Sequence, residues 1–234
     1  MTMRFDGFTH LTFDCYGTLI DWETGILTVL RSVLERHGQT AEDDALLRLY
    51  ADREAEQEAG DYRPYREVLR GVMAGIAETM AFEPTGDDLD ALPDSVGRWP
   101  PFADTVDALA RLKTRFKLVI LSNIDDAMFA ETNRHLKVEF DDIITAQQIG
   151  SYKPSHANFN HALARLAVPR EQVLHVAQSI FHDHVPAKAL GFTTVWVNRA
   201  SRCPRTGVAP PAHATPDFEV PDLKGFADML VYTV

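Results

Sequence analysis

One carboxylate stands where a parallel sheet would place its reactive groups. Asp14 follows directly after the apolar, strand-like residues 8–13 and precedes a turn at Gly17 and Thr18. In open α/β sheets, ligands bind beyond the carboxyl ends of the strands. An aspartate at this place can also simply cap the following turn. We predict a catalytic carboxylate at Asp14 rather than a surface charge.

Ser122 and Asn123 follow a second apolar run, residues 116–121, in the same way. A Ser-Asn pair at this place is a natural helix N-cap. A helix N-terminus also presents free N–H groups to an anion, so capping and ligand binding are compatible. We therefore keep both residues as candidates for the site.

Asp183 is flanked by His182 and His184, a pattern that could hold a metal ion. Zinc sites usually need three or four converging ligands, and the sequence offers no further cluster. We therefore predict that no metal binds here. We expect His184 to reach the site as a proton donor, and His182 to be packed or solvated. Cys15 adjoins Asp14, but successive strand residues face opposite ways, so we expect a buried thiol and not a nucleophile.

Short apolar runs alternate with helical stretches from about residue 104 onward. These runs lie at residues 116–122, 140–146, 173–178 and 192–198, and residues 8–13 would add one more strand. Helical periodicity or a helix-ending glycine marks the segments between them. Such alternation is typical of a parallel sheet wrapped by helices. We predict an α/β fold with a Rossmann-like parallel sheet.

The chain between residues 21 and 99 has a different pattern. Amphipathic helices are predicted there at residues 25–38, 42–60 and 65–80. Pro100 and Pro101 then prevent a helix from continuing and mark the return to the sheet.

These patterns divide the chain into two parts. We predict a Rossmann-like catalytic core made of residues 1–20 together with 100–234, and a helical cap, residues 21–99, inserted after the first strand. Residues 204–221 are rich in proline and are predicted to form a connection.

The composition is that of an ordinary globular chain, with 234 residues, 45% hydrophobic residues, 24% charged residues and a formal net charge of −11. Binding to nucleic acids or anionic membranes needs clustered lysines and arginines, and no such run occurs. Two cysteines and a first segment without an apolar signal core favour a reducing cytoplasm. No run approaches the roughly 18 apolar residues that span a bilayer. We expect a cytoplasmic protein without nucleic-acid or membrane partners.

Four ordered motifs resemble those of the haloacid dehalogenase superfamily. They are FDCYGTLID at residues 13–21, LSN at 121–123, YKP at 152–154 and HDHVPAKALG at 182–191. The resemblance covers nearly the whole chain and implies that superfamily's fold, a parallel-sheet core with an inserted cap. It also implies that Asp14 is a nucleophile that forms a covalent aspartyl ester, which water then hydrolyses.

Two residues separate this chain from the phosphatases of the superfamily. Phosphatases usually carry a second aspartate, their general acid, where this chain has Tyr16. They also carry an acidic residue that helps hold Mg²⁺ where this chain has Gln178, and Mg²⁺ prefers anionic oxygen ligands. The resemblance therefore implies displacement at carbon without a metal or other cofactor. A Mg²⁺-dependent phosphatase of a small phosphorylated metabolite stays as an alternative, and a non-catalytic binding protein with this fold is a third.

Within the superfamily, the chain is similar to type II L-2-haloacid dehalogenases. Residues 11–26, 118–125 and 150–154 look especially like azetidine-2-carboxylate hydrolase, a relative that opens a four-membered ring. Both imply a hydrolase that acts on a small 2-substituted carboxylate through the aspartyl ester. Dehalogenases commonly have tyrosine and asparagine where this chain has Phe159 and Ile180, so a substrate other than a chloroacid stays open.

The resemblance assigns further roles. Thr18 and Ser122 would donate hydrogen bonds to the nucleophile or to the substrate carboxylate. Lys153 would pair with Asp14 and Asp183 and keep both ionised, and Asp183 would position or deprotonate the hydrolytic water. The substrate site would be lined by Tyr16, Trp22, Arg53, Asn123, Phe159, Gln178, Ser179 and His184.

A cap arginine would help bind the leaving halide or the substrate carboxylate. Arg53 is the preferred match and Arg48 the other candidate, although a helix of this composition has solvent-facing arginines by default. The expected partner is a small-molecule carboxylate substrate. Relatives are often dimers, which suggests a homodimer, and the sequence leaves the oligomeric state open.

Overall fold

The computed structural model describes residues 5–199 and 212–231. Within these residues, six parallel strands form one sheet in the order β3-β2-β1-β4-β5-β6. The strands are β1 (His10–Phe13), β2 (Lys117–Ser122), β3 (Asp142–Thr145), β4 (Val173–Ala177), β5 (Thr193–Val197) and β6 (Phe218–Val220). The central strand β1 is buried at every position. The predicted α/β fold with a parallel sheet is confirmed.

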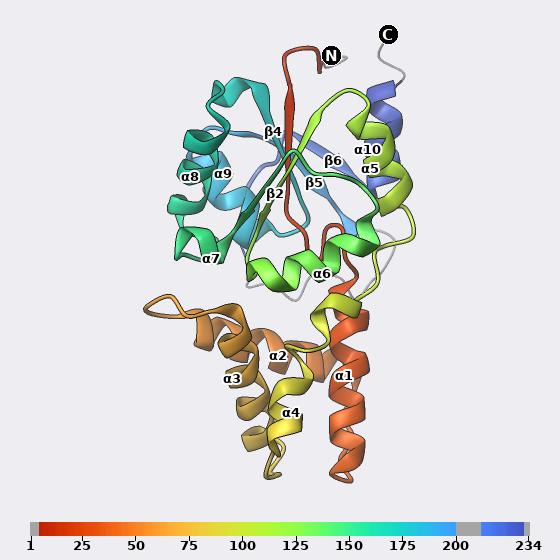
Figure 1. The fold of residues 1–234 in the computed structure, drawn as a ribbon, viewed down its shortest axis with the longest axis vertical. Coiled ribbons are helices and arrows are strands. Elements are labelled where there is room, and N and C mark those ends of the chain that lie inside the picture. Colours follow the sequence, from red (N-terminus) through yellow and green to blue (C-terminus); the bar gives the residue numbers. More distant parts are fainter. Residues whose placement is uncertain (1–4, 200–211, 232–234) are drawn as a thin grey trace.

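Helices cover both faces of this sheet (Figure 1). One face carries α5 (Thr105–Lys113), α6 (Asp126–Leu136) and α10 (Leu223–Val231). The other carries α7 (Ala146–Ile149), α8 (His156–Leu166) and α9 (Val185–Ala189). The strands are apolar on both sides because each side packs against a helical layer.

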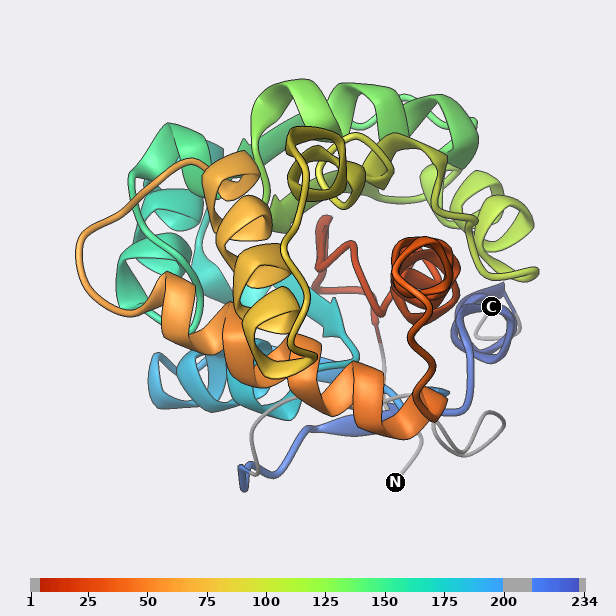
Figure 2. The ribbon, with the colours of Figure 1, turned by 90° about the horizontal axis from the view of Figure 1, so that it is seen from below.

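Four more helices lie beyond the carboxyl ends of the strands, as Figures 1 and 2 show. They are α1 (Trp22–Arg36), α2 (Asp43–Glu58), α3 (Tyr65–Thr79) and α4 (Gly86–Ala91). Side chains define where two of them begin. Asp21 Oδ1 accepts the Thr24 N–H at 3.2 Å at the start of α1, and Thr85 and Asp88 form a capping box on α4. The four helices cover the carboxyl edge of the sheet (Figure 1), which is the edge where open α/β sheets bind their ligands.

The end of the chain differs from the sequence-based prediction. Residues 204–221 are predicted to be a connection; residues 204–211 lie outside the described part, but Phe218–Val220 forms the edge strand β6. Phe218 pairs with Val195 and Val220 with Val197 of β5. The prediction is wrong for this strand, because an edge strand tolerates nearby proline and needs only a short apolar alternation.

The helices are short compared with a bilayer. The longest among the described residues, α2, has 16 residues. No helix in the described ranges is both long and apolar enough to cross a membrane.

Candidate active site

The turn after β1 places Asp14 at the carboxyl edge of the sheet. Gly17 in this turn has a φ of 91°, which L side chains rarely adopt, so glycine suits the position. Thr18 Oγ1 donates a 2.6 Å hydrogen bond to Asp14 Oδ2. The same hydroxyl accepts a 2.9 Å hydrogen bond from the backbone N–H of Gln178, just after β4. The turn therefore orients the buried carboxylate and engages one of its oxygens.

Lys153 lies between two aspartates. Its Nζ donates to Asp14 Oδ1 at 2.8 Å, to Asp183 Oδ1 at 2.7 Å and to the Leu121 carbonyl at 3.0 Å. These bonds use the three donors of the ammonium. Asn123 holds the Lys153 backbone, accepting its N–H at 2.7 Å and donating to its carbonyl at 3.0 Å. The fold thus brings together residues that are far apart in the sequence.

Burial and the shared lysine shift the pKa values of all three charged groups. Burial raises the pKa of Asp14, and Lys153 and Thr18 oppose this shift without reversing it. Burial alone would raise the pKa of Asp183, but Lys153 and His175 outweigh it and hold that pKa well below its usual range. Burial alone would lower the pKa of Lys153, but the two carboxylates raise it. Lys153 is therefore a fixed cation and Asp183 a fixed anion.

His175 in β4 belongs to this network, although its role was not predicted from the sequence. Its Nε2 lies 3.0 Å from Asp183 Oδ1, and its Nδ1 lies 3.0 Å from Thr12 Oγ1. Lys153 and His175 both engage Oδ1, whereas Asp183 Oδ2 and Ser122 Oγ are buried without a hydrogen-bond partner among the described residues. Two polar atoms thus stay free for a ligand. A histidine inside the otherwise apolar run VLHVA was the signal in the sequence.

A cavity of about 550 Å³ lies between the sheet edge and the helices beyond it. Most residues predicted from the sequence to form the site line this cavity. They are Asp14, Tyr16, Trp22, Ser122, Asn123, Lys153, Gln178, Ser179 and Asp183.

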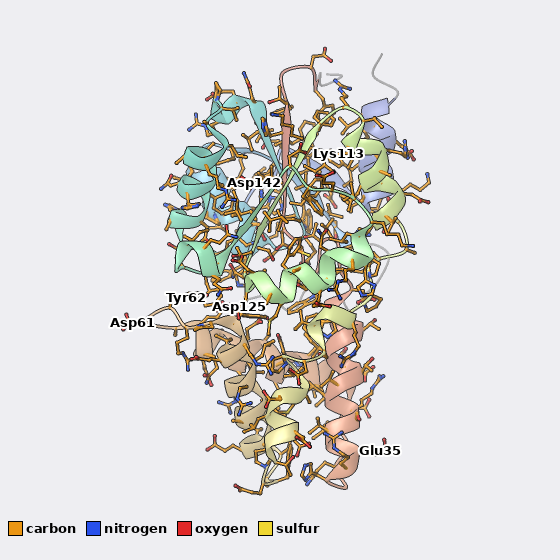
Figure 3. All side chains as sticks on the ribbon, viewed as in Figure 1. Glu35, Asp61, Tyr62, Lys113, Asp125 and Asp142 are labelled. Carbon is orange, nitrogen blue, oxygen red and sulfur yellow. The ribbon has the colours of Figure 1, made fainter. Side chains whose placement is uncertain are left out.

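Asp125 connects the sheet edge to the helices that cover the cavity. Its two carboxylate oxygens accept hydrogen bonds of 2.9 Å from the backbone N–H groups of Tyr65 and Arg66, which are free donors at the start of α3. The Tyr62 hydroxyl donates to Asp125 at 3.4 Å, and Figure 3 shows both residues at this junction. The Tyr62 ring packs against Tyr152, with 5.2 Å between centroids. These contacts close one wall of the cavity.

Arg53, predicted to bind the substrate, does not line the cavity. Its guanidinium donates to Glu56 at 2.7 Å and to Thr79 at 3.0 Å, both outside the cavity. The other candidate, Arg48, is exposed and is also absent from the lining. Successive helix residues are rotated by about 100°, so α2 presents Glu54 to the cavity and turns Arg53 away. The structure therefore corrects the prediction of a cap arginine at this site.

Three other predicted residues lie outside the lining. Phe159 is buried in an apolar cluster, with its ring edge-on to His175 at 5.1 Å between centroids. His184 Nε2 lies 3.0 Å from the carbonyl oxygen of Ala177, and burial lowers its pKa to about 4. This placement corrects the predicted proton-donating role of His184 in the cavity. Thr18 donates its hydrogen bond to Asp14 and does not itself line the cavity.

Acidic and aromatic residues of the covering helices line the cavity without having been predicted. Glu54 and Glu58 reach it from α2, and Tyr65 reaches it from α3. Leu46, Tyr50, Glu54 and Glu58 are spaced four residues apart, so one stripe of α2 begins with buried side chains and continues into two glutamates. This spacing was the signal that the sequence offered.

Replacing Arg53 with alanine is expected to leave kcat/KM within about twofold of the wild type. The side chain makes a solvent-screened ion pair with Glu56 outside the cavity, and such pairs contribute little to stability. Steady-state kinetics and thermal unfolding would measure both effects. A large rise in KM would contradict the placement of Arg53 outside the cavity.

Comparisons with known proteins agree with this architecture. A family model for haloacid dehalogenase-like hydrolases matches residues 8–191. The chain is 26% identical over 227 residues to an (S)-2-haloacid dehalogenase from Pseudomonas fluorescens, which covers 94% of this chain and 95% of the relative. It is 28% identical over 237 residues to an (S)-2-haloacid dehalogenase from Pseudomonas sp. (strain YL), which covers 94% and 93%.

A solved structure shares the fold. An L-2-haloacid dehalogenase from Xanthobacter autotrophicus superposes with a TM-score of 0.79 at 23% identity, covering 97% of this chain and 100% of that chain. The family match includes the turn at Asp14, the lysine that joins the two aspartates and the segment around Asp183. The chain therefore belongs to the haloacid dehalogenase-like hydrolases.

Proposed function

We propose that this chain is a metal-independent hydrolase that displaces a leaving group from a saturated carbon of a small 2-substituted carboxylate, through a covalent ester on Asp14. The arrangement at the cavity supports this most directly. Asp14 opens onto the cavity, Lys153 and Thr18 hold its two oxygens, and Asp183 keeps one oxygen free. The leaving group is a halide, as the names of the relatives suggest, or the ring amine of azetidine-2-carboxylate, as the sequence motifs suggest.

In the first step, a carboxylate oxygen of Asp14 attacks the carbon that bears the leaving group. A carbon–oxygen bond forms, the bond to the leaving group breaks, and the leaving group departs with the electron pair. Lys153 and Thr18 orient the nucleophile for this attack. A halide needs no proton to leave, whereas a ring amine would be protonated before the attack.

In the second step, water attacks the carbonyl carbon of the ester. Asp183 Oδ2 accepts the proton of this water, because its lowered pKa keeps it ionised and it has no other hydrogen-bond partner among the described residues. Lys153 Nζ stabilises the negative charge that develops on the ester oxygen. The ester bond then breaks, the product alkoxide takes the proton from Asp183, and one oxygen of the water stays in Asp14. The second proton of the water leaves Asp14 for solvent, which restores the carboxylate.

The residues around Asp14 fit Mg²⁺ poorly. Mg²⁺ favours several anionic oxygens, whereas Gln178 brings a neutral amide to the cavity. The Lys153 ammonium already engages one oxygen of each aspartate. The Tyr16 hydroxyl lies 2.9 Å from Thr132 Oγ1 and burial raises its pKa well above the usual value, so it is a poor general acid. These features favour displacement at carbon over phosphoryl transfer.

Isotope labelling tests the covalent step. Chelator-treated protein would be given L-2-chloropropionate, azetidine-2-carboxylate or phosphoglycolate in H₂¹⁸O, and the peptide that contains Asp14 would be analysed by mass spectrometry. We expect product from one of the two carbon substrates, and ¹⁸O in Asp14 after repeated turnovers. Product formation without label in Asp14 would contradict the ester. Phosphate release that requires added Mg²⁺ would identify a phosphatase instead.

A further inference from the structure

Two glutamates of α2 line the same cavity as Asp14. Glu54 and Glu58 are four residues apart, so they lie one above the other on a single face of the helix. The mechanism proposed above uses neither of them.

Glu54 is held by neighbouring hydroxyls, whereas Glu58 is not. Glu54 Oε1 accepts a 2.9 Å hydrogen bond from the Tyr50 hydroxyl and another from the Tyr65 hydroxyl. Glu58 makes no hydrogen bond or ion pair with any residue in the ranges 5–199 and 212–231. Burial raises the pKa of both carboxyl groups, and Glu54 raises that of Glu58 further, against the opposing charge of Lys153. Neither glutamate therefore forms an ion pair with a lysine or arginine of the described residues.

The cavity has more carboxylates than cations. Four of the described residues that line it carry carboxyl groups, and Lys153 is the one lysine or arginine among them. Its ammonium is already engaged by Asp14 and Asp183, at 2.8 and 2.7 Å. His182 also lines the cavity, but burial lowers its pKa to about 4, so it is neutral at pH 7. A cationic ligand would favour the ionised form of these buried carboxyl groups, and an anionic ligand would oppose it.

Aromatic rings and buried polar atoms complete the walls. The aromatic residues include Tyr16, Trp22, Tyr62, Tyr65 and Tyr152. The faces of such rings attract cations. On the sheet side, Ser122 is 3% exposed, and its Oγ has no hydrogen-bond partner in the described part of the chain; Asp183 Oδ2 is free in the same sense. Buried polar atoms of this kind indicate that a ligand completes the site.

We propose that the substrate carries a protonated amine, which binds to Glu54 and Glu58 while the reactive carbon lies at Asp14. This inference rests on the proposed function for the place of the reactive carbon and narrows its substrate class. Within that class, 2-substituted carboxylates that also carry an amine fit the cavity better than simple anionic haloacids. The ammonium donates hydrogen bonds to the two carboxylates, and its charge compensates theirs.

Three unreactive probes of similar size would test the amine site on the full chain. Butylammonium, 1-butanol and butyrate differ in charge and lack a leaving group, so their binding does not depend on the ester. NMR titration would measure each affinity for the wild type, Glu54→Gln, Glu58→Gln and Glu56→Gln. Glu56 lies on the same helix but pairs with Arg53 outside the cavity, so its variant is the matched control.

We expect butylammonium to bind at least about tenfold more tightly than butyrate, and Glu54→Gln or Glu58→Gln to weaken it about tenfold, because a charge-assisted hydrogen bond is lost. Glu56→Gln should change the affinity less than about twofold, because an exposed pair contributes little. Equal or tighter binding of butyrate, no binding of any probe, or unchanged butylammonium binding in both cavity variants would overturn the proposal.

Thermal unfolding shows whether Glu58→Gln folds. Burial raises the pKa of Glu58, so its ionised form costs stability once the pH exceeds the ordinary value of 4.5. At pH 7 the variant should therefore be at least as stable as the wild type, and lost amine binding cannot be attributed to unfolding. If Glu58→Gln melts at a lower temperature than Glu56→Gln, Glu58 stabilises the fold. That result would contradict the proposal that Glu58 is an unpaired carboxylate kept for binding a ligand.

The labelling of Asp14 separates this inference from the proposed function. Label in Asp14 without preference for butylammonium would refute the amine site and leave the ester standing. Preference for butylammonium without label would refute the ester and leave the amine site standing.

Discussion

Replacing Asp14 with asparagine is expected to abolish turnover and leave the fold intact. Asparagine keeps the size of the side chain and an acceptor for Lys153, but its neutral amide cannot form the ester. The rate should fall roughly 10⁴-fold or more, as it does when a covalent nucleophile is removed. Stability should not fall, because a raised pKa means that ionised Asp14 costs stability at pH 7, and Lys153 keeps Asp183 as its partner.

Product formation with the substrate found by labelling, together with thermal unfolding, would check this result. Asp107→Asn removes the same charge from an exposed position of α5 and is the matched control. Intact mass must show that the new asparagine has not reverted to aspartate by deamidation. Activity within tenfold of the wild type in an intact Asp14→Asn protein would exclude Asp14 as the nucleophile.

Replacing Lys153 with methionine is expected to remove activity and to lower stability. The substitution leaves two buried carboxylates without the ammonium that lies within 2.8 Å of both. Removing one partner of a buried ion pair costs about 3–5 kcal/mol, and each kcal/mol lowers the melting temperature by roughly 2–4 °C for a chain of this size. Without the lysine, a proton must neutralise one carboxylate, so its pKa rises in the folded state.

The sign of the pH dependence follows from this rise. A carboxyl group with a raised folded-state pKa binds its proton more tightly in the folded protein, so the variant is most stable at low pH and loses stability as the pH increases through that pKa. The deficit relative to the wild type should therefore grow from acidic to neutral pH.

Unfolding curves at several pH values and steady-state kinetics would measure these effects. Lys113→Met is the control, because Lys113 pairs with Asp141 at a half-exposed position, labelled in Figure 3, and surface pairs contribute roughly 0–1 kcal/mol. Equal stability of Lys153→Met and Lys113→Met at pH 7 would contradict a structural role for the buried ammonium.

The sheet and the residues at its edge could be predicted because their signals are local. Asp14 directly follows the apolar strand β1, and Ser122 is the last residue of the apolar strand β2. Parallel strands bring their carboxyl ends to one edge of the sheet. Lys153 could be selected only through the order of the motifs, and the histidines beside Asp183 suggested a metal site rather than a partner for that lysine. The structure brings Lys153 into contact with both aspartates.

Other parts of the site depend on how elements pack. Phe159 and His184 are near motif residues in the sequence, yet both side chains pack into the interior beside the cavity. His175 meets Thr12 because β4 pairs with β1, and it meets Asp183 because that aspartate lies in the π-helical segment Ile180–His184 that follows β4. The histidine in the run VLHVA was a local signal of a buried polar group, but the partners of all three side chains depend on how the elements pack.

By itself, the sequence determined approximately where five of the six described strands end, which polar residues follow them and to which superfamily the motifs are similar. Only the tertiary structure decided which charged residues line the cavity. One residue along a helix is a rotation of about 100°, so the packing of α2 against α1 and α3 determines whether Arg53 or Glu54 lines the cavity. The sequence alone does not specify that docking, because α2 carries charged residues on several sides, and the packing of Leu46, Leu47 and Tyr50 sets its rotation.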